Sequence, residues 1–230
     1  MTADEGLGAT RGRGAPSAAG SDGDEHGFLG AVLAGGRNTR YGDHKALAEV
    51  GGVPIAARAA RALGEAGCHP VVLIANEPGV YAPLGLPLRS DARAGLGPLG
   101  GIHAALLWVR DEGLPGAVVV AGDMPFAAPE LLRELARRAA APGVDAAVPE
   151  SPGKRGVEPL CAAYAVSCLP AVEAAVAGGG GRIVGFYESI SLDRVEAARV
   201  ARFGDPGVMF RNVNTPADRA AADRLHEAAP

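Results

Sequence analysis

The stretch from Phe28 to Lys45, FLGAVLAGGRNTRYGDHK, constrains the fold of this chain more than any other. It opens with an apolar run, Phe28 to Leu33, that is rich enough in large side chains to form a buried strand. The run stops at Gly35-Gly36, where glycine permits a tight turn and a close approach of the main chain to a ligand. The stretch therefore predicts a first strand that leads directly into a glycine turn.

Three cations follow the glycine turn, at Arg37, Arg40 and Lys45. Arginine and lysine side chains, together with exposed backbone N–H groups, are the groups with which proteins hold phosphate oxygens. One interpretation is a polyphosphate site, and the other is a plain glycine turn with solvated charges. Neither the P-loop pattern nor a Gly-x-Gly-x-x-Gly fingerprint follows the strand, so a nucleotide site here would be of a different type.

Further apolar runs alternate with stretches of helical pattern along the chain. A strand, helix, strand order with a crossover of helix length predicts a parallel sheet with helices packed on it, an α/β fold. The predicted strands after the first are 70–76, 84–88, 117–121, 145–149 and 160–166, and the predicted helices are 55–65, 102–110, 129–140, 170–177 and 217–228.

Polar residues stand where two of the predicted strands end. Asn76 closes the second strand, and Asp123 follows the most β-like run of the chain. Open parallel sheets bind their ligands at the carboxyl ends of the strands. A carboxylate there suits Mg²⁺, and an N-cap role for Asp123 is disfavoured because the next helix begins only at Pro129. Asn76 has the alternative role of a turn former.

Two further glycine-rich segments are candidate ligand-binding loops. Residues 95–101, GLGPLGG, can lay backbone groups against a flat ring, although a tight connection is the simpler alternative. Four glycines, 178–181, precede Arg182 and form either a hinge or a backbone cradle that Arg182 closes.

In the polar loop 150–158, Lys154 and Arg155 form either a solvated turn or a basic rim over an acidic second substrate.

Near the C-terminal end, Asn212 and Asn214 alternate along an extended segment, so both side chains are able to face one way. Thr215 and Pro216 then give a helix start that needs no functional explanation, with threonine as the N-cap and proline at the first helical position. The asparagines are the candidate site residues of this segment.

Composition narrows the class of protein. Residues 1–26 lack large apolar side chains and predict a disordered tail, which leaves 27–230 as a single domain. The net charge is only −4 over 230 residues, so nucleic acid and anionic lipid are not expected partners. Three cysteines without a Cys-x-x-Cys pair, and no apolar run long enough for a membrane span or a signal core, favour a cytoplasmic protein.

Taken together, these motifs resemble the molybdenum cofactor guanylyltransferase family. The resemblance covers most of residues 28–225 and is carried by LAGGRNTRYGDHK, by Asn76, by Asp91 followed by GPLGGI, by AGDMP and by FRNVNTP. It implies a three-layer α/β/α sandwich with a mostly parallel sheet. The implied reaction transfers GMP from GTP to the terminal phosphate of molybdenum-molybdopterin with release of pyrophosphate, in the presence of Mg²⁺. Proteins that insert molybdenum or receive the cofactor are the implied partners.

The resemblance also implies roles for individual residues. It implies that Lys45 and Arg40 bind phosphate oxygens and that Asp123 binds the metal ion. The segment with Asn212 and Asn214 is implied to lie near the second substrate and the metal, and Arg182, after the glycine run, is a further candidate for the second substrate. The implied nucleotide-binding residues are Leu33, Ala34, Gly35, Gly36, Lys45, Asn76, Asp91, Gly97, Pro98, Leu99, Gly100 and Asp123.

Three positions depart from the family pattern. Tyr41 replaces a usual methionine, Gly122 stands where a cysteine often precedes the aspartate, and Val157-Glu158-Pro159 is unusual on the pterin side. Other functions are therefore kept open. They are a cytidylyltransferase, a sugar-phosphate nucleotidyltransferase and, from another class, a non-catalytic carrier of nucleotide or cofactor. The asparagines of the late motif and the Gly-Pro-Leu-Gly-Gly loop favour guanine over cytosine.

Overall fold

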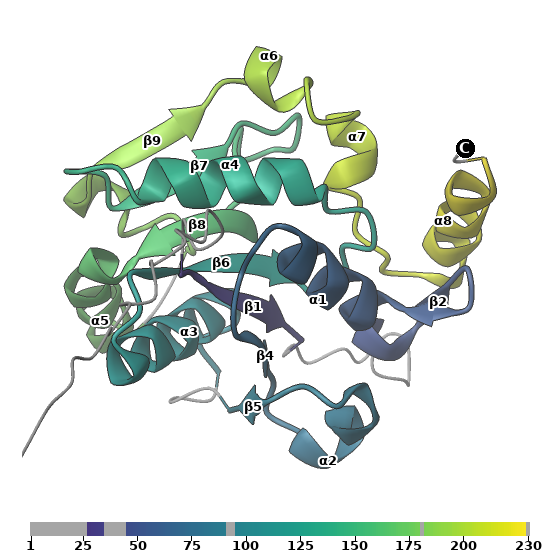
Figure 1. The fold of residues 1–230 in the computed structure, drawn as a ribbon, viewed down its shortest axis with the longest axis horizontal. Coiled ribbons are helices and arrows are strands. Elements are labelled where there is room, and N and C mark those ends of the chain that lie inside the picture. The colour runs from purple at the N-terminus through teal and green to yellow at the C-terminus, as the bar shows by residue number, and fades with distance from the viewer. Residues whose placement is uncertain (1–26, 35–44, 91–94, 180–181, 229–230) are drawn as a thin grey trace, which may run out of the picture.

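A seven-stranded sheet forms the centre of the computed structural model, which describes residues 27–34, 45–90, 95–179 and 182–228 (Figure 1). The strand order is β5-β4-β1-β6-β8-β7-β9. The predicted tail, 1–26, lies outside the described residues. The strands of this sheet are β1 (Leu29–Leu33), β4 (Val71–Ile74), β5 (Leu88–Arg89), β6 (Gly116–Ala121), β7 (Ala146–Pro149), β8 (Cys161–Ala165) and β9 (Leu192–Val195).

The sheet is mostly parallel, as the sequence predicts. The pairs β1 with β4, β1 with β6, β4 with β5, and β7 with β9 are all parallel. Strand β8 is the exception, because it runs antiparallel to both of its neighbours, β6 and β7. The start of β8 consequently lies at the same edge of the sheet as the end of β6.

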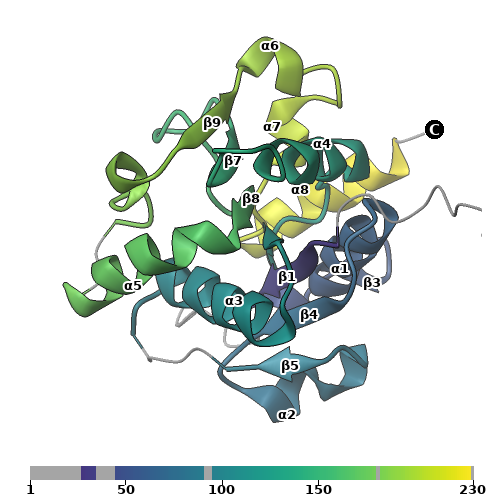
Figure 2. The same ribbon diagram turned by 60° about the vertical axis from the view of Figure 1, so that its left-hand side comes forward.

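Helices cover both faces of the sheet and complete the expected three-layer sandwich, with α1 and α4 on one face and α3 and α5 on the other (Figure 2). None of the helices in the described ranges is long and apolar enough to span a membrane. The α-helices are α1 (Ile55–Glu65), α2 (Pro78–Tyr81), α3 (Pro98–Glu112), α4 (Pro129–Ala139), α5 (Leu169–Ala177), α6 (Ala197–Val200), α7 (Pro206–Met209) and α8 (Pro216–Glu227). Short 3₁₀ turns are η1 (Lys45–Leu47), η2 (Ala82–Leu84), η3 (Val166–Cys168) and η4 (Tyr187–Ser189).

The core is divided into two apolar layers because neighbouring strand residues point to opposite faces of the sheet. In β6, Val118 and Val120 pack in the layer under α1 and α4, and Val119 packs in the layer under α3 and α5. All three side chains are completely buried. This double burial explains why the central strands are continuous apolar runs rather than alternating ones.

Several elements differ from the sequence-based expectation, among them the short elements α2, α6, α7 and β9, which it does not include. The run 84–88 contributes only Leu88 to the two-residue strand β5, since Leu84 ends η2 and residues 85–87 have no regular structure. Helix α3 begins at Pro98 and not near residue 102, because the Leu99 side chain packs in the core, where the residue is only 1% exposed. A small hairpin of β2 (Glu49–Val50) and β3 (Val53–Pro54) was not predicted, although its turn residues Gly51 and Gly52 both have the positive φ that such turns require.

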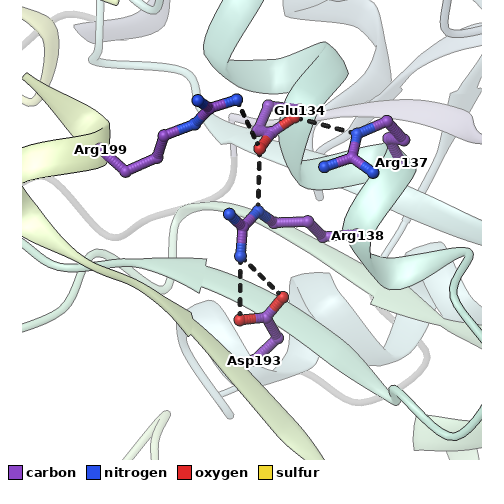
Figure 3. A network of polar contacts seen from close by, with 5 residues as sticks. All are labelled: Glu134, Arg137, Arg138, Asp193 and Arg199. Carbon is purple, nitrogen blue, oxygen red and sulfur yellow. Dashed lines mark hydrogen bonds and ion pairs between the residues drawn. The ribbon is translucent and has the colours of Figure 1, made fainter. Parts of the chain in front are cut away.

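An ion-pair network joins α4 to the edge of the sheet, and Figure 3 shows its members. The carboxylate of Glu134, only 8% exposed, accepts hydrogen bonds from Arg137 and Arg138 at 3.0 Å and from Arg199 at 3.1 Å. Arg138 also reaches both carboxylate oxygens of Asp193 in β9. The hydrogen bond from Arg137, followed by that from Arg138, lowers the pKa of Glu134 to about 2 despite its burial.

We expect Glu134→Gln to lower the free energy of unfolding by about 2–3 kcal/mol, because three arginines lose their shared carboxylate. The midpoint of thermal unfolding should fall by roughly 5–10 °C. The folded pKa lies below the ordinary value of 4.5, so this stabilisation is present above pH 4.5 and is lost as the pH falls toward 2. Calorimetry between pH 3 and 7 checks both points, and the exposed Glu130→Gln on the same helix is the control. Equal stability of the two variants at pH 7 would contradict the assignment.

Candidate functional site

The carboxyl ends of three parallel strands meet at one edge of the sheet. Leu33 of β1 is in register with Ile74 of β4 on one side and with Ala121 of β6 on the other. Main-chain hydrogen bonds continue past the strands, since the Gly122 N–H donates to Leu33 O at 2.8 Å and the Ala34 N–H donates to Ile74 O at 2.9 Å. The segments that follow these strands therefore begin side by side, which is where an open parallel sheet binds ligands.

Asp123 lies at this edge, one residue beyond the contact between Gly122 and β1. Its side chain is half-buried, and burial raises the pKa of the carboxyl group while the nearby Lys45 charge partly opposes the rise. Gly122 matters for this placement, because a Cβ there would lie 3.0 Å from Leu33 O and 3.2 Å from the Ala34 Cα. A larger residue at position 122 would displace the end of β1, so glycine suits this version of the site.

The segment before α8 closes the site from the C-terminal side. The Val213 N–H donates to Asp123 O at 2.9 Å, and the Val213 side chain is buried. Asn212 and Asn214, on either side of it, are both exposed, as their alternation predicts. Asn214 Oδ1 accepts a hydrogen bond of 2.5 Å from Lys45 Nζ. The structure thus brings together Lys45, Asp123 and Asn214, which are 169 residues apart at the extremes.

Glu158 is a member of the site that sequence reasoning did not identify. It lies three residues before the start of β8, whose antiparallel course places Leu160 O in a 2.8 Å hydrogen bond with the N–H of Ala121. Burial raises the pKa of Glu158, Arg155 lowers it, and the negative charge of Asp123 raises it again. Glu158 is therefore a second carboxylate within electrostatic range of Asp123. The only available signal was the unusual Val157-Glu158-Pro159 segment.

Tyr81 contacts the main chain just after β1, and the sequence analysis does not identify it as a site residue. Its hydroxyl donates to Ala34 O at 2.9 Å, and its ring is 5% exposed. This contact holds the main chain at the point where β1 enters the predicted glycine turn. A single tyrosine in the short helix α2 offers no periodic pattern that predicts this role.

The predicted nucleotide loop 97–100 forms the start of α3. Gly97 has φ +57°, a value that favours glycine, and precedes an exposed Pro98 at the first helical position. The Leu99 side chain and Gly100 are buried, so these two residues can offer a ligand only main-chain groups. Asn76 is exposed beyond the end of β4, at the edge described above.

Other predicted site residues fall elsewhere. Arg182 lines a cavity together with Lys154, Arg155 and Pro98, and neither Lys45 nor Asp123 is among its lining residues. Four predicted residues lie outside the described residues, so the structure does not place them. They are Gly35, Gly36, Arg40 and Asp91.

The donor set at this edge fits a magnesium ion that is held jointly by protein and substrate. Mg²⁺ typically takes one or two carboxylates, several waters and the phosphates of a nucleotide. Asp123 supplies one carboxylate and Glu158 lies within electrostatic range of it. Within the described ranges, no group of three or more His, Cys, Asp or Glu side chains could hold a metal by itself. Asp123 is therefore the candidate protein ligand for such an ion.

Comparisons with known proteins give a consistent result. Residues 30–192 match the model of the MobA-like NTP transferase domain. A relative from Pelotomaculum thermopropionicum, named "Probable molybdenum cofactor guanylyltransferase", is 36% identical over 198 residues, which are 86% of this chain and 93% of the relative. A relative from Rhodobacter capsulatus, named "Molybdenum cofactor guanylyltransferase", is 36% identical over 209 residues and covers 88% of this chain and 99% of the relative.

The structural comparison agrees with the sequence comparison. The crystal structure of molybdopterin-guanine dinucleotide biosynthesis protein A from Archaeoglobus fulgidus has a TM-score of 0.72 and 27% identity to this chain. The match covers 88% of this chain and 100% of that structure. The sheet and its flanking helices therefore have the arrangement of a solved protein of this kind.

Proposed function

The chain belongs to the MobA-like NTP transferase family, a family of nucleotidyltransferases, and from that premise we propose that it transfers GMP from GTP to molybdenum-molybdopterin. The observation that carries the proposal is the meeting of Lys45, Asp123 and Asn214 at the carboxyl edge of the sheet. A cation and a carboxylate at this edge are what a metal-bound triphosphate needs.

In the proposed reaction, an oxygen of the terminal phosphate of molybdopterin attacks the α-phosphorus of GTP. The new P–O bond joins acceptor and GMP, and the bond between the α-phosphorus and the bridging oxygen breaks to release pyrophosphate. The attacking phosphate is already anionic near neutral pH, so the chain needs no nucleophilic serine or cysteine. It has to place the two phosphates in line and neutralise their charge.

The residues of the site divide this work. Lys45 neutralises the phosphate oxygens, and Asn214 holds the ammonium group of Lys45 in place. Asp123 holds the magnesium ion, which when bound supplies positive charge to the phosphate oxygens. Arg40, Gly35 and Gly36 are proposed to complete the triphosphate site on the strength of the family motif.

The nucleotide base is proposed to lie along the start of α3. Asn76 and the main chain of residues 97–100 are the proposed guanine and ribose contacts, together with Asp91 from the family motif. Helix α3 has no side-chain hydrogen bond at its N-cap, Gly97, but Pro98 has no N–H and the Gly100 N–H already donates to Gly97 O at 3.0 Å. The exposed main chain of Gly97 and Pro98 is therefore the part of this loop that is proposed to contact the base. Asn212 and Arg182 are proposed on the side of the second substrate.

A turnover assay across the four ribonucleoside triphosphates tests this function. Purified protein, Mg²⁺ and molybdenum-molybdopterin should release pyrophosphate from GTP at least about tenfold faster than from ATP, CTP or UTP, since a base held by hydrogen bonds is discriminated by more than about 1.4 kcal/mol. A preference for CTP would identify a cytidylyltransferase. Binding of GTP without pyrophosphate release with any acceptor, sugar phosphates included, would identify a carrier.

A further inference from the structure

A cavity of about 510 Å³ opens between the start of α3, the loop that contains Lys154 and Arg155, and the segment 182–184. This volume lies within the range of about 300–1,000 Å³ that is usual for sites of small molecules. Its lining consists of Pro98, Lys154, Arg155 and residues 182–184. The cavity is therefore large enough for one ring system with its substituents.

The lining has a cationic part and an apolar part. Lys154, Arg155 and Arg182 are all exposed and carry three positive charges, and no acidic side chain lines the cavity. Within the described residues, none of the three forms an ion pair with a carboxylate. The apolar part is Pro98 with Ile183 and Val184. A flat ring that bears anionic groups matches both parts.

The cavity is adjacent to the proposed nucleotide site without being the same place. Pro98 belongs to both the cavity and the proposed guanine loop. On the other side, the charge of Arg155 acts on Glu158, and Glu158 in turn lies within range of Asp123. A molecule in the cavity would consequently contact Pro98 of the base loop and Arg155, whose charge acts on Glu158.

We propose that this cavity binds the acceptor substrate and that Lys154 and Arg155, together with Arg182, select it by its anionic groups. The proposal rests on the proposed function for the identity of the acceptor, a pterin that carries a phosphate. Lys154 and Arg155 are specificity-determining residues, because they neutralise the substrate without touching the reacting α-phosphorus. Under this proposal, the 150–158 loop is a substrate contact rather than a solvated turn.

A fluorescent, oxidised pterin phosphate is the probe for the test. Its binding to the full chain is followed by fluorescence anisotropy at 50 mM and 200 mM salt, with and without saturating GTP. Wild-type protein should bind the probe more weakly at high salt and should retain it in the presence of GTP. Lys154→Glu/Arg155→Glu should weaken probe binding about tenfold or more and reduce its salt dependence, while the affinity for GTP stays unchanged.

The matched control is Arg194→Glu/Arg202→Glu, which makes the same change of net charge at two exposed residues in and after β9. This variant should bind the probe like wild type. Equal weakening in both variants, unchanged binding in the Lys154/Arg155 variant, or displacement of the probe by GTP would each overturn the proposal. Because the readout is binding, a cavity that behaves as expected in a protein that never releases pyrophosphate would disprove the proposed function alone.

Discussion

Asp123→Ala should lower kcat/KM for GTP by about a hundredfold or more, a loss of about 3 kcal/mol of transition-state stabilisation. The reason is its proposed role as the protein ligand of the magnesium ion that neutralises the triphosphate. The measurement is pyrophosphate release at several Mg²⁺ concentrations, and the Mg²⁺ concentration for half-maximal rate should rise as well. Normal turnover by a folded Asp123→Ala protein would remove the metal assignment.

The same substitution should leave the fold intact or stabilise it. Burial raises the pKa of Asp123, so the folded protein binds this proton more tightly than the unfolded chain does. The ionised carboxylate therefore costs stability at neutral pH, and stability falls as the pH rises through the raised pKa. Asp123→Asn removes that cost and should unfold at the same temperature as wild type or higher. Asp111→Ala, an exposed aspartate on α3, is the control and should leave turnover unchanged.

The sequence predicts the centre of this fold well because its strands are buried on both faces. Continuous apolar runs such as 117–121 leave little choice of structure, and β6 follows the run closely. The N-cap of α8 is confirmed by the hydrogen bond from the Asp218 N–H to Thr215 Oγ1. The effect of the Lys45 charge on Asp123 agrees with the expectation that the segments after β1 and β6 meet at one edge of the sheet.

The sequence pattern does not reveal whether a strand runs parallel or antiparallel to its neighbours. The run 160–166 is equally apolar whether the strand is parallel or antiparallel, and its position next to β6 depends on packing across the whole sheet. Glu158 reaches the site because β8 runs antiparallel, so the unusual Val157-Glu158-Pro159 segment could not by itself show that Glu158 lies near Asp123. The start of α3 was missed for a related reason, since the burial of Leu99 outweighs the low helix propensity of its glycine neighbours.

Lys45→Ala should also reduce kcat/KM for GTP by about a hundredfold or more, because it removes a positive charge from the proposed phosphate site. Unlike Asp123→Ala, it should lower the unfolding temperature slightly, since the half-buried Asp123 loses the charge that opposes its raised pKa. Steady-state kinetics and thermal unfolding measured on the same samples separate the two effects. A turnover rate within a few-fold of wild type would contradict the phosphate role of Lys45.

The contact between Lys45 and Asn214 makes a sharper prediction possible. If Asn214 acts by holding the ammonium group of Lys45, Asn214→Ala should cost about tenfold, a smaller loss than Lys45→Ala. The double variant should then be no worse than Lys45→Ala, because there is no ammonium group left to position. Costs that simply multiply would show instead that Asn214 contacts a substrate independently of Lys45. The late asparagine motif would then be part of the acceptor site rather than a support for the phosphate-binding lysine.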